Sequence, residues 1–354
     1  QGARRHRNPI AQPVLSNFPH FLRTMSRLST LAAAVLLGLA GQVRATFTPM
    51  LLIGVNTAPG NVMQRKEIRQ SWMQSPYVAG PDKSVVVKFL VGKPANSDDA
   101  KLLKQDMIQH KDFVELPIQE GYHNLVNKTI AFFRWFALAG TARYAMKLDD
   151  DTYPNFNRLM PLLQLKTENK KQYTYAGDMM MQNKPLLWGK WRQDPAVYNE
   201  TYYPPYASGP GYLMGADLIQ RIFNKNYQAH LAYRLDNEDA NCGVWVHREG
   251  LTGLEIDYTN LDAEEEGCRP GVYLAMNMPT GTGNLKCMFE RQLAGEPDMC
   301  CDHHLSAWSD RNAVGFLRGS SSRHPLCPAG WSEEQDRAFV WRWATQPLLD
   351  FRAS

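Results

Sequence analysis

Continuous apolar runs alternate with amphipathic stretches along the first half of the folded part of this chain. The runs at 50–55, 85–91 and 144–148 are mainly apolar, as expected for strands buried on both faces of a parallel sheet. A shorter run at 113–116 predicts a further strand. Strands that alternate with helices predict an α/β fold, in which a parallel sheet carries helices on both faces. The helices are predicted at 62–73, 98–110 and 125–139.

Beyond Pro161 the pattern loosens. A loop rich in aromatic residues and proline extends to Gly211, and 262–327 has no periodicity that assigns it to helix or strand. One domain at 48–354, with an irregular cysteine-bearing C-terminal part, is the interpretation that domain sizes favour. One strand and two helices are still predicted in this half, at 173–177, 217–223 and 239–248.

An uncharged segment at 28–43 stands apart from this pattern, with Arg23 and Arg27 before it and Arg44 after it. It is shorter than the roughly 20 residues of a membrane-spanning helix. It matches the apolar region of a signal peptide, and a short type II signal anchor is the alternative. Both interpretations place the rest of the chain in the secretory lumen. The basic tail at 1–27 is expected to be unfolded.

Charge and cysteine content narrow the class of protein. Lys and Arg number 39 against 35 Asp and Glu, so the net charge of +4 predicts no nucleic-acid partner. All six cysteines lie in the C-terminal third, where an oxidising lumen allows up to three disulfides. The sequons at Asn127 and Asn199 are compatible with that compartment, and Asn199 is favoured because Asn127 falls in a predicted helix.

Three consecutive aspartates, Asp149, Asp150 and Asp151, directly follow the apolar run at 144–148. Adjacent carboxylates repel one another and cannot all be buried in ionised form without a compensating cation. At the end of a strand in an open α/β sheet they would form an oxygen site suited to Mn²⁺ or Mg²⁺. The alternative interpretation is a solvated acidic turn that caps the next helix.

Two further charged pairs admit a functional and a structural interpretation. Arg65 and Arg69 share one face of a predicted helix and could meet a diphosphate, or they bond to acidic neighbours as a structural pair. Glu238 and Asp239 open another predicted helix. Asp239 is either its N-cap or a general base, since an ordinary aspartate pKa of about 3.9 leaves it ionised at neutral pH.

Aromatic side chains and histidines supply the remaining candidates. The aromatic loop contains Trp188 and Tyr206, whose rings suit stacking on sugars and equally suit a rigid core loop. His303 and His304 are either structural or offer a nitrogen ligand that completes a Mn²⁺ site begun by Asp151. The sequence has no phosphate-binding P-loop, no dinucleotide glycine motif after the first strand and no serine-hydrolase elbow.

Six stretches follow one another in a recognisable order. They are Arg-x-x-x-Arg-x-Ser-Trp at 65–72, Glu-x-Tyr-x-Asn-Leu-x-x-Lys-Thr at 120–129, Lys-x-Asp-Asp-Asp at 147–151, Tyr-Pro-Pro-Tyr-Ala-Ser-Gly-Pro-Gly-Tyr at 203–212, Glu-Asp-x-x-x-Gly at 238–243 and His-His-Leu-Ser at 303–306. In this order they resemble the β-1,3-glycosyltransferases, which include galactosyl- and N-acetylglucosaminyltransferases and the fringe proteins. The chain departs from the family pattern at Ala240, at Pro210 and over 262–301.

The resemblance implies a Rossmann-like nucleotide-sugar transferase fold of the GT-A type. It also implies a Golgi enzyme that uses UDP-galactose or UDP-N-acetylglucosamine and forms a β-1,3 linkage on a glycan, glycoprotein or glycolipid acceptor, with inversion. The implied roles are Asp239 as base, Asp151 and His303 as ligands of Mn²⁺ or Mg²⁺, Arg65, Arg69, Lys147, Asp149 and Asp150 as nucleotide-sugar contacts, and Trp188, Tyr206, Gly209 and Glu238 as acceptor or sugar contacts.

Two other classes of function remain as alternatives. One is an inactive lumenal lectin or chaperone that keeps the transferase fold, and the other is a metal-dependent sugar-nucleotide hydrolase. The intact aspartate triplet and the Glu238–Asp239 pair argue against a pure binding protein, which has no physical need for both.

Overall fold

The computed structural model describes residues 48–296, apart from positions 82, 171, 190, 232–233, 266–271, 277 and 279–282. The predictions made for 1–27, for 28–43 and for His303 and His304 therefore lie outside the described residues. Within the described residues, no helix has both the length and the apolar character needed to cross a membrane.

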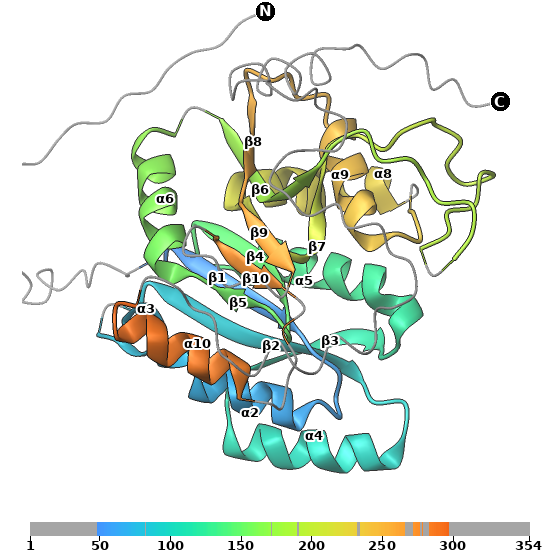
Figure 1. Ribbon diagram of the computed structural model, residues 1–354. Coiled ribbons are helices and arrows are strands. Elements are labelled where there is room, and N and C mark those ends of the chain that lie inside the picture. Colours follow the sequence, from blue (N-terminus) through green and yellow to red (C-terminus); the bar gives the residue numbers. More distant parts are fainter. Residues whose placement is uncertain are drawn as a thin grey trace, which may run out of the picture. The chain divides into compact units, whose positions relative to one another are not determined.

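A seven-stranded sheet lies at the centre of the described part of the chain (Figure 1). All neighbouring strands pair in parallel except for β7, which runs antiparallel to both of its neighbours, and this mostly parallel sheet confirms the predicted α/β class. The strands, from one edge to the other, are β3 (Phe113–Gln119), β2 (Val85–Lys93), β1 (Leu51–Asn56), β4 (Tyr144–Asp149), β7 (Tyr206–Gly215), β6 (Tyr173–Met180) and β8 (Ile256–Asn260).

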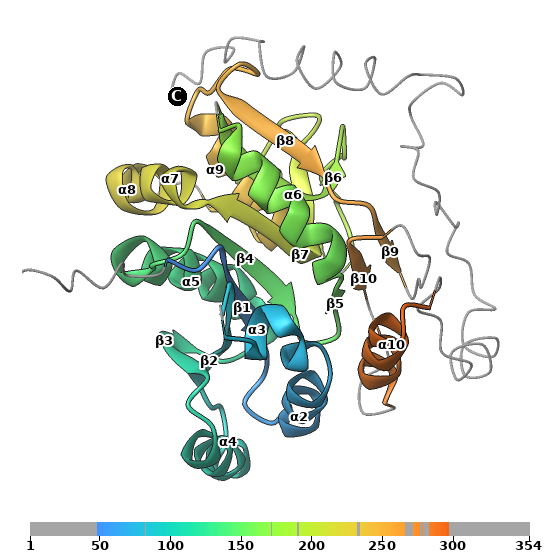
Figure 2. The same ribbon diagram turned by 90° about the vertical axis from the view of Figure 1, so that its left-hand side faces the viewer.

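Helices cover both faces of this sheet (Figure 2). One face buries an apolar cluster under α5 (Leu125–Ala139), α7 (Ala216–Gln220) and α9 (Glu238–Arg248). The other buries a second cluster under α2 (Val62–Gln70), α6 (Phe156–Glu168) and α10 (Asn284–Leu293). The remaining helical elements are η1 (Trp72–Gln74), α3 (Pro76–Ala79), α4 (Ser97–Gln109), η2 (Tyr122–Asn124), the π-helical η3 (Arg221–Lys225) and α8 (Tyr227–Leu231).

The pattern-based predictions succeed where an element is long and periodic. The helix predicted at 125–139 has those same bounds in α5, and strands form at all five positions predicted for them. The helix predicted at 62–73 is shorter, because α2 ends at Gln70 and a 3₁₀ turn follows.

The predicted loop up to Gly211 is wrong in its last residues, since β7 already begins at Tyr206. Its glycine- and proline-rich sequence is typical of a loop, but here the small residues allow close packing. A Cβ added at Gly211 would lie 2.9 Å from Cδ1 of Leu148, and one at Gly209 would lie 2.6 Å from Oδ1 of Asp239.

The segment predicted as irregular at 262–327 also contains regular structure in its described part. A small sheet joins β5 (Tyr153–Pro154), β10 (Leu274–Met276) and β9 (Ala263–Glu265), and α10 follows it. The strands are only two or three residues long, too short for a periodic signal.

The strand order places one ligand-binding edge at β1 and β4. These strands are parallel neighbours. After β1 the next strand of this sheet is β2, on one side of the pair, and after β4 it is β6, on the other side beyond β7. Asn56, the last residue of β1, pairs in register with Asp149, the last residue of β4. The loop after β1 and the aspartate triplet therefore start side by side at the carboxyl edge, where open α/β sheets bind ligands.

Candidate active site

Lys147 links the aspartate triplet to the second carboxylate pair. Its Nζ lies 2.7 Å from Oδ1 of Asp149 and 3.5 Å from Oε2 of Glu238, and it donates a hydrogen bond to the carbonyl of Gly209. The side chain is fully buried. Burial alone would lower the pKa of Lys147, but Asp149, Glu238 and Asp239 raise it above its ordinary value. Lys147, which was predicted to contact the nucleotide sugar, is thus a buried cation that bonds to protein groups.

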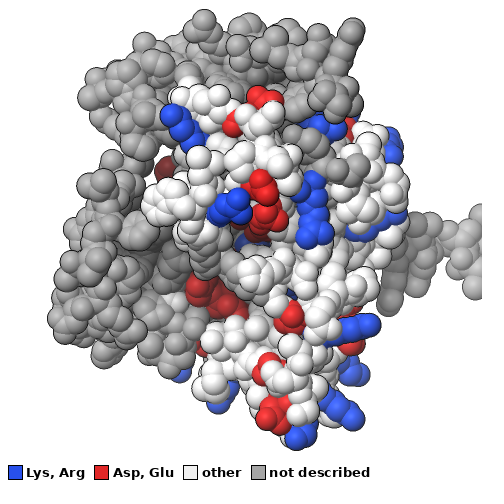
Figure 3. Space-filling model, turned by 90° about the vertical axis from the view of Figure 1, so that its right-hand side faces the viewer, with Lys and Arg blue, Asp and Glu red and all other residues white. Residues whose placement is uncertain are grey.

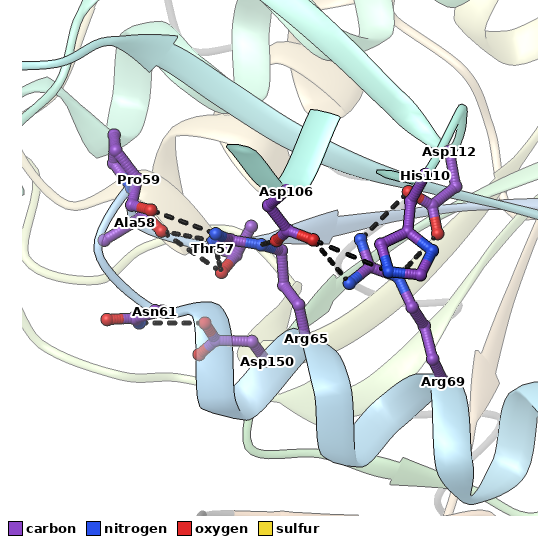
Figure 4. Close-up of polar contacts among 10 residues, drawn as sticks. All are labelled: Thr57, Ala58, Pro59, Asn61, Arg65, Arg69, Asp106, His110, Asp112 and Asp150. Atoms are coloured by element: carbon purple, nitrogen blue, oxygen red, sulfur yellow. Dashed lines mark hydrogen bonds and ion pairs between the residues drawn. The ribbon is translucent and has the colours of Figure 1, made fainter. Parts of the chain in front are cut away.

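The three aspartates differ in their surroundings. Asp149 pairs with Lys147, and burial nevertheless raises the pKa of Asp149 to about 7. Asp150 accepts a 2.9 Å hydrogen bond from the side-chain amide of Asn61, in the loop after β1 (Figure 4). For the carboxylate of Asp151 the structure shows a 3.5 Å contact from the hydroxyl of Thr152. The carboxylate of Asp151 also has a hydrogen bond to the backbone of its own residue. Its hydrogen bonds thus stay within residues 151 and 152, whereas Asp149 pairs with the buried Lys147 and Asp150 bonds to the loop after β1.

The donor chemistry of this edge fits a hard divalent cation with few protein ligands. Among the described residues, no group of three or more His, Cys, Asp or Glu side chains is arranged to hold a metal ion. Mg²⁺ commonly takes only one or two carboxylates and fills its shell with water and substrate phosphates. Burial and the charge of Asp150 raise the pKa of Asp151, and a cation would relieve this crowding of like charges. The predicted partner ligand, His303, lies outside the described residues.

Asp239 stands at the start of α9 without capping it. The cap is Asn237, whose side-chain oxygen accepts a 3.1 Å hydrogen bond from the backbone N–H of Ala240. The N-cap interpretation of Asp239 is therefore wrong. Burial and the neighbouring Glu238 raise the pKa of Asp239 well above its ordinary value, which suits a base that works nearer to neutral pH. The two carboxylate oxygens lie close against Gly209, where a Cβ would come within 2.6 and 2.7 Å of them.

Glu238, predicted as an acceptor or sugar contact, is held from inside the protein. Its Oε1 accepts a 2.5 Å hydrogen bond from the Tyr212 hydroxyl, which also lies 3.1 Å from Sγ of Cys242. Cys242 is a free, buried thiol, so the six cysteines do not form three disulfides. Glu238 thereby fixes the position of α9 relative to β7.

Arg65 and Arg69 both turn toward protein carboxylates (Figure 4). Nε of Arg65 lies 2.7 Å from Asp106, and its terminal nitrogens donate to the carbonyls of Ala58 and Pro59 at 2.6 and 3.0 Å. The guanidinium of Arg69 lies 2.9 Å from Asp106 and bonds to both oxygens of the Asp112 carboxylate. This geometry fits the structural interpretation of the pair. Arg65, which is fully buried, shapes the loop that carries Asn61.

We predict that Arg65→Met destabilises the protein, because Asp106 would remain buried with one of its two cations removed. Loss of one partner of a buried pair costs about 3–5 kcal/mol of unfolding free energy. Because Arg69 still binds Asp106 in the variant, we expect a loss at the lower end of this range. Urea unfolding measures it, with the exposed Arg143→Met as a control. Unchanged stability together with weaker UDP binding would instead support the interpretation of Arg65 as a diphosphate contact.

A second buried cation supports the same loop from the other side. Nζ of Lys128, on α5, donates to the carbonyl of Thr57 at 2.7 Å and to Glu120 at 2.6 Å. Glu120 in turn accepts from the backbone N–H of Gly92, at 2.5 Å, near the end of β2. The motif at 120–129 therefore ties the ends of β1 and β2 together.

A pocket of about 320 Å³ lies next to the start of α9. Tyr206, a predicted sugar contact, is one of its walls, whereas Trp188 is 79% exposed and is not among its lining residues. On the face in Figure 3, acidic and basic side chains are interspersed. The residues that line the pocket are Asn183, Lys184, Leu186, Trp191, Tyr203, Tyr206 and Asn237.

Comparison with known proteins identifies the family of this chain. The model of the galactosyltransferase family matches residues 63–257, a region that runs from α2, past the triplet and Asp239, into β8. The chain belongs to the galactosyltransferase family. This family membership agrees with the resemblance found in the sequence.

Named members of the galactosyltransferase family show the extent of the likeness. Hydroxyproline O-galactosyltransferases GALT2 and GALT5 of Arabidopsis thaliana are 29% and 30% identical over 71% of this chain, covering 36% and 37% of their own lengths. Beta-1,3-galactosyltransferase 1 of Mus musculus is 28% identical over 57% of this chain and 61% of its own length. The chain thus spans little more than a third of the plant relatives.

Several residues of the candidate site could not be identified from the galactosyltransferase motifs alone. Asn61 carries no motif signal, although its place just after β1 is a clue to its contact with Asp150. Tyr203 and Tyr212 lie within the motif at 203–212, yet only the fold shows that one lines a pocket and the other bonds to Glu238. Asn183 and Trp191 reach the pocket from the irregular loop after β6.

Proposed function

We propose that this chain is an inverting, metal-dependent galactosyltransferase of the GT-A type. It would transfer galactose from UDP-galactose to an acceptor hydroxyl and form a β-1,3 linkage. The observation that carries the proposal is the meeting of two carboxylate groups at the β1–β4 edge, the triplet after β4 and the pair at the start of α9, with Lys147 between them. The family and the names of the relatives favour galactose over N-acetylglucosamine.

The proposed reaction is a single displacement. The acceptor hydroxyl loses its proton to the carboxylate of Asp239, and its oxygen attacks the anomeric carbon of the donor sugar. The bond from that carbon to the UDP oxygen breaks, and its electron pair leaves with UDP. Because attack and departure take place on opposite faces, the anomeric configuration inverts. Asp149 and Asp150 would hold the donor, and Lys147 would fix the distance between the two carboxylate groups.

Asp151 and His303 are the residues that would hold the divalent cation. Bound Mn²⁺ or Mg²⁺ supplies neutralisation of the charge that develops on the departing diphosphate. Asp151, which is half-buried, would supply a carboxylate oxygen as ligand at the donor edge.

A Golgi or other lumenal location, with the chain held as a type II membrane protein or released after cleavage, is part of the same proposal. It rests on the segment at 28–43. Exposed Asn199, in the loop after β6, is the sequon that a lumenal glycosylation enzyme would reach.

The raised pKa of Asp239 predicts an acid limb in the pH profile of transfer. Only ionised Asp239 accepts a proton, so the rate falls as pH drops through this raised pKa. Glu238→Gln removes the neighbouring negative charge and should lower the pKa of Asp239, which moves the acid limb to lower pH. Initial rates of UDP release at each pH measure this. A limb that stays in place in the variant would exclude Asp239 as the group that limits the rate.

A donor screen with the full chain tests the proposal. UDP release is measured with UDP-galactose, UDP-N-acetylglucosamine and UDP-glucose, with and without glycan acceptors. Acceptor-dependent release from UDP-galactose is expected. Release of free galactose at the same rate with and without acceptor would indicate a hydrolase, and no release from any donor would indicate a binding protein.

A further inference from the structure

The pocket beside α9 is built onto the proposed catalytic base. Asn237, one of its walls, caps the helix whose second residue is Asp239. Tyr206, another wall, packs so tightly on α9 that a Cβ added at Gly243 would lie 2.4 Å from Cβ of Tyr206. The pocket therefore adjoins the first turn of α9, which carries Asp239.

The pocket combines a fixed aromatic wall with amide groups. Tyr203 lies with its ring centroid 5.0 Å from that of Tyr198 and 5.9 Å from that of Tyr206. The Tyr206 hydroxyl accepts a 3.0 Å hydrogen bond from the side chain of Asn183. Trp191 is half exposed, at 51%.

These groups match a saturated ring with several hydroxyls. A pyranose presents a C–H face that packs on aromatic rings, and its hydroxyls bond to amide and ammonium groups such as those of Asn183, Asn237 and Lys184. The volume lies at the low end of the roughly 300–1,000 Å³ of small-molecule sites, which suits one ring. A hydroxyproline ring has a single hydroxyl and would leave most of these polar groups unused.

We infer that this pocket binds the terminal sugar ring of the acceptor and that Trp191, Tyr203 and Asn183 determine which sugar is accepted. The inference rests on the proposed function, since it makes the acceptor a glycan and directs one of its hydroxyls toward Asp239. The donor would bind on the other side of Asp239, at the triplet.

Variants of two accessible lining residues test this inference. Trp191→Ala and Asn183→Ala should each raise the KM for methyl β-galactoside by about tenfold, with the KM for UDP-galactose unchanged. Leu254→Ala is the matched control, because Leu254 is an exposed apolar side chain outside the pocket. An unchanged acceptor KM in both pocket variants, or an equal rise in the control, would overturn the inference.

A binding measurement keeps this test separate from that of the proposed function. Saturation-transfer NMR with methyl β-galactoside and UDP present should detect binding by the wild-type chain and its loss in Trp191→Ala. If this loss is seen while the wild type turns over no donor, the proposed function fails and the sugar pocket stands. If a hydroxyproline peptide binds in a Trp191-dependent way and the galactoside does not, the assignment to sugar is wrong.

Discussion

Asp239→Asn is expected to abolish sugar transfer in a protein that still folds and still binds UDP. The asparagine side chain keeps the shape beside Gly209, but it cannot take the proton from the acceptor hydroxyl. Loss of a positioned general base typically lowers a rate by roughly 10²–10⁴-fold. Because the base acts on the acceptor, the affinity for UDP at the triplet should change little.

The measurement is acceptor-dependent UDP release, with UDP affinity by titration calorimetry on the same preparation. Asp98→Asn is a suitable control, since Asp98 is an exposed aspartate in the first turn of α4. A fully active Asn variant would remove Asp239 as the base. Parallel loss of UDP binding and melting temperature would instead indicate a structural role for this carboxylate.

The second large effect is expected at the metal ligand. Asp151→Ala should lower transfer by about 10³-fold, because a catalytic cation contributes several kcal/mol of charge stabilisation that the variant would lose. The wild-type chain should lose activity in EDTA and regain it when Mn²⁺ is added. Titration of Mn²⁺ followed by water-proton relaxation should show weaker binding in the variant.

The contacts of the three aspartates predict which substitution affects metal binding most selectively. Asp150 bonds to Asn61, and Asp149 pairs with Lys147, so loss of either should disturb the arrangement of the site as well as the donor. Asp151, with its long contact to Thr152, should affect the metal most selectively. Activity that is indifferent to chelator in the wild type would contradict the cation site.

The sequence predicts the frame of this fold because the frame is built from long, uniformly patterned elements. The strands β1, β2 and β4 bury mainly apolar runs, and α5 buries the apolar face of an amphipathic stretch, so these elements can be recognised without knowledge of the rest of the chain. The start of β7 could not be predicted, because its glycines allow close packing against β4 and α9, and only the assembled sheet shows this packing.

The candidate site, like the fold, is predictable only where its signal lies within one stretch of the sequence. The location of the triplet is predictable, since a strand end in a parallel sheet is a ligand edge in most α/β folds. The partners of Arg65 and Arg69 are not, because Asp106 and Asp112 lie about forty residues away and meet them only when α4 packs beside α2. For the same reason the pocket walls at Asn183 and Trp191 could not be chosen from among the many residues of their loop.

The anomeric configuration of the product tests the central claim most directly. The full chain is incubated with UDP-galactose, Mn²⁺ and methyl β-galactoside, and the product is characterised by proton NMR. A direct displacement assisted by Asp239 at the β1–β4 edge predicts transferred galactose in the β configuration, linked to the 3-hydroxyl. An α-linked product, or free galactose with no disaccharide, would contradict this account of the site.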